Sequence, residues 1–242
     1  MAPIPIPPTG PAGPAVTIAQ LPLFPLQSVL FPDGLLPLQI FEIRYLDMIA
    51  RRHQAGAPFG VVCLSEGSEV RRPSRAPATP TGEAFAHEAF HPVGTLARID
   101  DFWRPQPGLV RVQCTGTRRF RVSGAAQQRY GLWVADVELL PDDTPVAVPD
   151  DLAFVRDALE GLLRKIEASL DLSAESGRPT EAELPLRKPY RWDDCGWLAN
   201  RWCEMLPLDA VRKQRFMQID SPLLRLELVA DALQQIGIGS TG

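Results

Sequence analysis

The stretch LPLFPLQSVLFPDGLLPLQIFEIRYLDMI, residues 21–49, contains the change of pattern that decides the fold of the first half of the chain. Its first part is a series of short apolar runs broken by proline. Of these, LLPLQIF (35–41) predicts a strand, because proline withholds a hydrogen-bond donor and is tolerated at strand edges. Apolar residues then recur at helical spacing from Ile43 to Ile49, and Gly56 ends the pattern. The stretch therefore predicts extended chain that leads into one helix.

Further strand-like runs continue to about residue 140. Val110, Val112 and Cys114 alternate with polar residues, which is typical of a half-buried strand. Residues 66–90 interrupt the runs with Pro, Ser, Thr, Gly and charged residues, and predict a long surface loop. The predicted strands are FGVVCL (59–64), VGTLARI (93–99), LVRVQCTG (109–116), RRFRVSG (118–124) and LWVADVELL (132–140).

The second half of the chain has a helical pattern. An apolar stripe from Leu152 to Leu170 predicts a long helix with Asp150 and Asp151 as its caps, and residues 171–190 predict a loop. Three shorter helices are predicted after it: one from Cys195 to the break at Pro207, one from Asp209, and one from Ser221-Pro222 to Gly237.

These patterns predict an α+β fold with a β-rich first half and a helical second half. Six prolines in the first fourteen residues predict an extended, disordered arm. The expected organisation is an arm over 1–20, a β-rich subdomain over 21–148, a helical bundle over 149–238 and a tail over 239–242.

The composition excludes several classes of protein. With 45% hydrophobic residues the chain can bury a sizeable core, and its net charge of −4 disfavours binding to nucleic acid or an anionic membrane. No apolar run approaches the roughly 18 residues of a membrane span, and the uncharged first twenty residues lack the basic start of a signal peptide. The four cysteines form no C-x-x-C pair, which is typical of a reduced, cytoplasmic protein.

HEAFH (87–91) matches the H-E-x-x-H pattern of zinc hydrolases. That pattern binds zinc only on a helix, where both imidazoles face one ion. Here Pro92 follows at once and a predicted strand begins, and on a strand His87 and His91 would stand about 13 Å apart. We therefore expect no metal site, and metal-dependent hydrolysis stays a minor alternative.

Other catalytic motifs are also missing. GIGSTG (237–242) matches G-x-G-x-x-G, but it follows a helix instead of joining a strand to a helix. Each lysine follows an arginine, so the sequence has no G-K-[S/T] phosphate loop, and it has no G-x-S-x-G elbow. We expect a protein that is not an enzyme and needs no cofactor.

Aromatic residues are the first candidates for a binding surface. Phe102 and Trp103 lie in DDFWRPQPG, a Pro- and Gly-rich turn between two predicted strands. Trp197 lies about 100° from the stripe of Leu198 and Trp202 on its helix, so we expect it to be exposed. Exposed tryptophans are common binding anchors, although both could instead pack at a junction between subdomains.

A basic cluster is the second candidate. Arg111 precedes TGTRRFRVSG, which contains Arg118, Arg119 and Arg121. One interpretation is a surface that contacts RNA or phosphate. The other interpretation is the solvent-facing side of a strand pair whose apolar residues point inward. The net negative charge of the chain favours this second interpretation.

Several of these runs follow one another in an order that is characteristic of a known family. LPLFPL, FP-x-G and LPL-x-IFE-x-RY lie within residues 21–49, FGVV, VGTLARI and GTRRFRV follow, and a helical sequence over 198–233 closes the series. The series resembles the N-terminal, substrate-binding domain of the Lon ATP-dependent proteases. The resemblance implies a PUA-like β pseudo-barrel with one helix, followed by a C-terminal helical bundle. Full Lon proteases also have an ATPase module with a phosphate loop and a protease module with a Ser–Lys dyad, and this sequence contains neither.

The resemblance therefore implies a stand-alone domain that binds unfolded polypeptide or a specific protein partner. Binding would use a groove between the two halves or strand addition at an open sheet edge. RNA binding is the alternative, because PUA-like folds often bind RNA. We expect a monomer or weak homodimer, since full Lon assembles through the modules that this sequence lacks.

Four residues of the matching motifs have expected structural roles. Gly34 and Gly94 would permit turns or close backbone approach. Glu42 suits the positive end of the helix dipole, and Arg44 would pair with a carboxylate or with carbonyl groups and so fix the helix to the strands.

Overall fold

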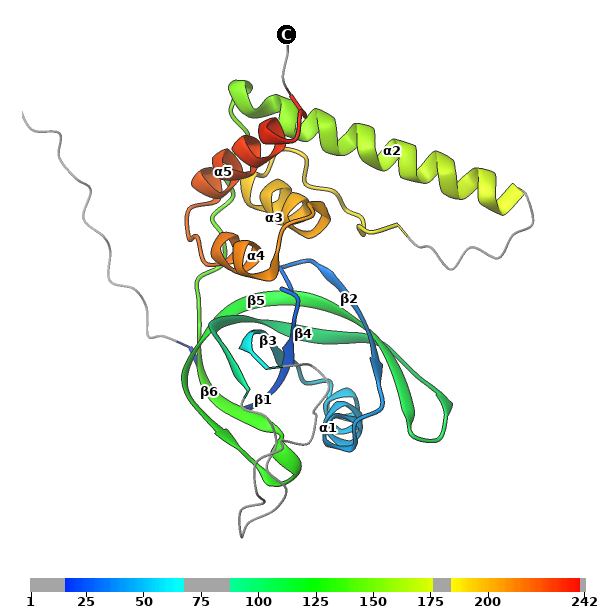
Figure 1. Cartoon of the computed structure of the whole chain (residues 1–242), viewed down its shortest axis with the longest axis vertical. Coiled ribbons are helices and arrows are strands. Elements are labelled where there is room, and N and C mark those ends of the chain that lie inside the picture. Colours follow the sequence, from blue (N-terminus) through cyan, green and yellow to red (C-terminus); the bar gives the residue numbers. More distant parts are fainter. Residues whose placement is uncertain (1–15, 68–87, 176–183, 240–242) are drawn as a thin grey trace, which may run out of the picture.

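The structure is a computed structural model, and it describes residues 16–67, 88–175 and 184–239 of the chain. The strands are β1 (Thr17–Leu26), β2 (Leu35–Ile40), β3 (Phe59–Glu66), β4 (Ala89–Gln106), β5 (Leu109–Gln127) and β6 (Trp133–Leu139). The α-helices are α1 (Ile43–Gln54), α2 (Ala153–Glu175), α3 (Cys195–Met205), α4 (Ala210–Met217) and α5 (Pro222–Gln235). The strands and α1 form one half and α2 to α5 form the other, which confirms the expected α+β fold (Figure 1).

The described strands form one curled sheet. Their order is β2-β5-β4-β3-β1-β6, and β6 also pairs with β5, so the sheet closes on itself through β6. The β1–β3 pair is parallel and the other pairs are antiparallel. Among the described strands β2 pairs with β5 alone, which makes it an edge strand. The helix α1 lies against the sheet and packs its Tyr45, Met48 and Ile49 onto Phe24 and Phe59.

The long strand β5 replaces two predicted strands. The sequence predicts a break at Thr117, but the backbone stays paired with β4 on both sides of this residue. Thr95 of β4 lies opposite Arg119 and Ala97 lies opposite Gly116, so β5 has one extra residue at this point. Such a β-bulge shifts the phase of the apolar alternation, and the sequence pattern therefore reads as a break.

Close backbone approach explains two of the motif glycines. A Cβ added at Gly94 would overlap the carbonyl oxygen of Val61 on the neighbouring strand. A Cβ added at Gly34 would overlap the carboxylate of Glu204 and lie 2.9 Å from the carbonyl oxygen of Phe31. The expected role of both glycines is confirmed.

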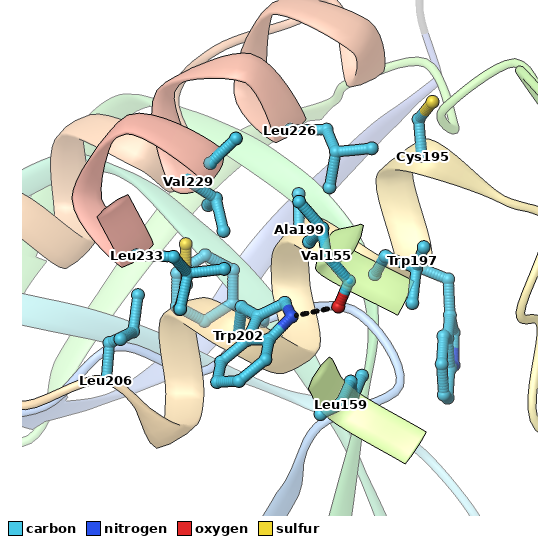
Figure 2. Close-up of a cluster of buried hydrophobic side chains, with 14 of the residues drawn as sticks. Val155, Leu159, Cys195, Trp197, Ala199, Trp202, Leu206, Leu226, Val229 and Leu233 are labelled. Carbon is cyan, nitrogen blue, oxygen red and sulfur yellow. Dashed lines mark hydrogen bonds between the residues drawn. The ribbon is translucent and has the colours of Figure 1, made fainter. Parts of the chain in front are cut away.

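The helical half has its own apolar core, formed by α2, α3 and α5. Leu159, Leu198 and Leu226 are fully buried in it. Trp202 lies among them, and its Nε1 donates to the carbonyl oxygen of Val155 at 2.9 Å (Figure 2). This core places α3 and α5 side by side above the sheet (Figure 1).

The predicted starts of α3, α4 and α5 are confirmed by their caps. The side chains of Asp194, Asp209 and Ser221 each accept a hydrogen bond from a backbone N–H in the first turn of the helix that follows. Each cap satisfies a donor that would otherwise lack an intrahelical partner. Pro222 occupies the first turn of α5, where proline is favoured.

Other element boundaries differ from the predictions. Asp150 and Asp151 do not cap α2, because they lie in a 3₁₀ turn (Asp150–Leu152) whose N-cap is Pro149. Helix α2 continues to Glu175, inside the segment predicted as a loop. Strand β1 begins at Thr17, inside the segment assigned to the arm. The rest of the arm (1–15), the middle of the first predicted loop (68–87), part of the second (176–183) and residues 240–242 of the tail lie outside the described residues.

Buried arginines join the two halves. Arg119 of β5 donates to the carbonyl oxygen of Met217 in α4 at 2.9 Å and pairs with Asp143 at 3.2 Å. Arg225 of α5 pairs with the same carboxylate at 2.6 Å. Arg201 of α3 donates to two carbonyl oxygens of the loop between β1 and β2. These charge-assisted bonds hold the helices against the sheet at a fixed position.

In the described ranges 16–67, 88–175 and 184–239, no helix is both long enough and apolar enough to cross a bilayer.

Candidate functional site

Two cavities lie against the edge strand β2. The first has a volume of about 620 Å³ and separates β2 from the helical half. The second has a volume of about 970 Å³ and lies beside the β4–β5 hairpin. Pro37 and Gln113 line both cavities and are partners across the β2–β5 pair. The two cavities therefore meet along β2, and we call the combined depression the β2 groove.

The β2 groove is mostly apolar and follows a strand with one free edge. Leu35, Leu36 and Leu38 of β2 line it, together with Met205 of α3. A free strand edge carries unpaired backbone donors and acceptors that can bind an extended peptide. Pro37 in the middle of β2 contributes no N–H, and this limits pairing with a second copy of the edge.

Trp103 stands at the hairpin end of the β2 groove. It does not lie in the turn, as the sequence suggested, but within β4 and opposite Arg111 of β5. Gln39 of β2 lies opposite Arg111 on its other side, so the three residues form a row across three strands. All three are exposed, and the Trp103 side chain keeps 52% of its surface accessible. Trp103 is thus available to a ligand in the groove.

Phe102, next to it in sequence, has a different role. It lies opposite Val112, which is buried, and so points to the other face of the sheet. Its ring stacks on the imidazole of His53 in α1, with 4.6 Å between the ring centroids. Phe102 therefore packs the hairpin against α1, although it borders the groove.

The expectation that Trp197 is exposed is wrong. Its side chain is 4% exposed and lies in the helical core (Figure 2). The rings of Tyr190 and Trp192 pack on it, with centroids at 6.1 and 5.4 Å. These two residues belong to the non-helical segment before α3. That segment covers the face of α3 that helical periodicity alone predicts to be exposed to solvent.

The end of the β2 groove nearest the helices is polar. Glu204 lines it and pairs with Arg201 at 3.1 Å, while Lys213 Nζ donates to the Glu204 carbonyl oxygen at 3.0 Å. Burial raises the pKa of the Glu204 carboxyl to about 7, and the charges on Arg201 and Lys213 oppose that rise while Asp33 adds to it. Glu204 therefore changes its charge near neutral pH.

The four arginines of the basic cluster do not form one surface. Arg111 and Arg121 are exposed, as the interpretation of a solvent-facing strand side predicts. Arg119 is buried in the junction between the halves, and Arg118 pairs with Asp142 at 3.2 Å. Because two of the four cations are already paired with carboxylates, the structure does not favour the RNA alternative.

The HEAFH motif has a structural explanation where it is described. His87 lies outside the described residues, and His91 is extended, as expected before Pro92, because β4 begins four residues earlier than the predicted strand. Glu88 is buried, and its carboxylate accepts a hydrogen bond from Trp133 Nε1 at 2.9 Å and pairs with Arg44 at 3.4 Å. Within the described parts of the chain, no three His, Cys, Asp or Glu side chains gather as metal ligands.

The four cysteines are buried and free. Burial raises the pKa of Cys114 and Cys203 to about 12 and that of Cys195 to about 11. A thiol with so high a pKa stays protonated at neutral pH and is a poor nucleophile. These three residues are core residues.

Together these features define a class of protein: a two-part α+β domain whose curled sheet is fixed to a helical bundle by buried arginines and whose edge strand borders an open groove. The chain belongs to the family of the ATP-dependent protease La (LON) substrate-binding domain, whose model matches residues 20–235.

Individual relatives agree with the family. The chain is 25% identical over 225 residues to Lon protease 2 of Herpetosiphon aurantiacus, and the match covers 91% of this chain but 24% of that protein. Among solved structures it is similar to a Lon N-terminal domain protein from Xanthomonas campestris, with 27% identity, a TM-score of 0.64, and coverage of 88% of this chain and 98% of that one. The N-terminal domain of a Mycobacterium avium complex Lon protease has 14% identity, a TM-score of 0.55 and coverage of 88% and 96%, and shows the fold alone.

Proposed function

We propose that this protein is a polypeptide-binding module that holds exposed apolar segments in the β2 groove. The observation that carries the proposal is the continuity of two apolar cavities along an edge strand, with an exposed tryptophan at one end. Strand β2 has six residues, so the groove matches an extended segment of roughly 20 Å. Membership of a substrate-binding domain family supports the same class of ligand.

Two kinds of contact would act together in this groove. The free edge of β2 offers backbone groups that bind any sequence, while Leu35, Met205 and Trp103 bind apolar side chains. A large aromatic side chain at such a site commonly contributes about 2 kcal/mol or more to binding. The module would therefore select for apolar content and extended conformation, without a strict sequence motif.

We also propose that the protein is not an enzyme and acts in a reducing compartment such as the cytoplasm. The protonated state of its buried thiols and the use of Glu88, Arg44 and Arg119 in internal ion pairs support the first point. Four free cysteines support the second. RNA is not the proposed ligand.

The test is a titration followed by fluorescence anisotropy, with a labelled and permanently unfolded polypeptide. We expect saturable binding that changes little between roughly 0.05 and 0.5 M salt, because the contacts are mostly apolar. Trp103→Ala is expected to weaken binding about tenfold or more. Ile236→Ala is the matched control, since this residue is 54% exposed but lies outside the groove.

Equal affinity of the wild type and Trp103→Ala would contradict the proposed site. A short RNA titrated in parallel separates the alternative, because RNA binding would fall steeply as the salt concentration rises.

A further inference from the structure

A second depression, with a volume of about 1050 Å³, lies between α1 and the segment that leads into β6. One wall is the face of α1 that carries Arg44, Met48 and Arg52, and the other contains Tyr130 and Leu132. The residues that line it differ from those of the β2 groove. We call it the α1 groove.

One end of the α1 groove presents large apolar side chains to solvent. Ile43 is 77% exposed and Tyr130 is 79% exposed. Tyr130 has a φ of 63° and a ψ of 8°, a left-handed conformation that costs free energy for a residue with a Cβ. Arg44 Nη1 donates to the carbonyl oxygen of the next residue, Gly131, at 3.1 Å and fixes this turn beside the start of α1. The expected pairing of Arg44 with carboxylates and a carbonyl is thereby confirmed.

The strain at Tyr130 has no packing benefit within the described part of the chain. A side chain that is four-fifths exposed gains little from burial, and glycine would adopt the same backbone conformation at lower cost. A strained residue held by a buried ion-pair network, with its ring directed to solvent at the rim of a groove, is a feature of binding sites.

The other end of the α1 groove holds a cation, Arg52, for which the described residues provide no anionic partner. Arg51 pairs with Asp47 at 2.7 Å, and Arg44 pairs with Glu42 and Glu88. The Arg52 side chain is half-buried and, among the residues the structure describes, has neither a carboxylate nor a hydrogen-bond partner. Burial lowers the pKa of Arg52, and no charge within the described residues opposes the shift.

The position of Arg52 in the last turn of α1 gives a simpler explanation, since cations there stabilise the helix dipole. Arg51 in the same turn already provides that charge at the exposed surface. A guanidinium that is partly removed from solvent without an anionic partner is less favourable than one that gains an anion.

We propose that the α1 groove is a second polypeptide site, selective for an apolar segment that carries an acidic side chain. The large apolar residue would contact Ile43 and Tyr130, and the carboxylate would pair with Arg52. Ile43 and Arg52 are nine residues apart on α1, an axial rise of about 13 Å, and project from opposite sides of the face that lines the groove, so an extended chain needs at least about four residues to span them. The inference rests on the proposed function only in that the ligand is a polypeptide.

The test uses short labelled peptides of Gly, Ser and Gln with one Phe and one Glu four positions apart, in both orders. We expect the better of the two to bind the protein at least tenfold more tightly than the same peptide with Glu→Gln. In Arg52→Gln this preference disappears, and in Arg164→Gln it remains, because Arg164 is exposed, pairs with Glu160 and lies outside the groove. Equal affinity for the Glu and Gln peptides, or a preference that persists in Arg52→Gln, would overturn the proposal.

A second variant separates binding from folding. Tyr130→Gly relieves the left-handed strain, so its Tm should rise by about 2 °C. Its affinity for the Glu peptide should nevertheless fall several-fold, because the ring is lost. A variant that binds the peptide as well as the wild type would show that Tyr130 is not part of the site.

The two proposals fail independently. Arg52→Gln and Tyr130→Gly should leave the Trp103-dependent binding of a neutral unfolded polypeptide unchanged, since neither residue lines the β2 groove. If the wild type shows no preference for the acidic peptide but Trp103-dependent binding is present, the proposal for the α1 groove is wrong. If the preference is present but binding does not depend on Trp103, the proposal for the β2 groove is wrong.

Discussion

At the scale of single residues, the buried arginines bind backbone groups of this chain instead of an external ligand. Arg119, Arg201 and Arg225 are each at most 5% exposed. Arg119 and Arg201 donate to carbonyl oxygens of distant segments, and Arg225 donates to that of Ile219, just before its own helix. The sequence shows these positions only as basic residues. Nothing in it distinguishes Arg119 from the exposed Arg121, because both lie on one face of β5 and only Arg119 is covered by Met217 and Asp143, which are distant in sequence.

Glu204 gives a pH-dependent prediction at this scale. Its pKa is raised from 4.5 to about 7, so between these values the folded protein binds more protons than the unfolded chain. Its contribution to stability is therefore full below pH 4.5 and is lost as the pH rises through 7. Glu204→Gln lacks this titration, so we expect the wild type to lose stability relative to the variant as the pH rises. Urea unfolding at several pH values measures the difference, and a difference that does not change with pH would contradict the assignment.

At the scale of elements, local chemistry was enough to predict much of the fold. Apolar spacing places α1 and α3, and Asp209 and Ser221 place the starts of α4 and α5, because a cap and its helix are adjacent in sequence. Features that depend on a distant segment were missed. The bulge in β5 needs β4, and the burial of Trp197 needs the segment that carries Tyr190 and Trp192.

The candidate site was predicted only in part for the same reason. Trp103 was found because an aromatic residue beside proline and glycine is unusual for a core position. The rest of the β2 groove comes from β2, β5, α3, α4 and the segment before α3, which meet only in the folded protein. The strained Tyr130 has no sequence signal, apart from the glycine that follows it.

At the scale of the whole molecule, one carboxylate connects the two halves. Asp143 lies between β6 and α2 and pairs with both Arg119 and Arg225. Asp143→Ala leaves two buried guanidinium groups without this partner, so we expect a loss of about 3–5 kcal/mol in the free energy of unfolding. Asp142→Ala is the control, since this exposed residue pairs with Arg118 and should cost at most about 1 kcal/mol. Equal and small losses in urea unfolding would show that the junction does not depend on Asp143.

Hydrogen–deuterium exchange would locate a bound polypeptide at the β2 groove. The protein is compared with and without a saturating, permanently unfolded polypeptide. We expect slower amide exchange in β2, residues 35–40, and in the hairpin around Trp103, because a bound segment covers the free edge and its neighbours. Unchanged exchange in β2 while the polypeptide is bound, with protection confined to another surface, would contradict this expectation.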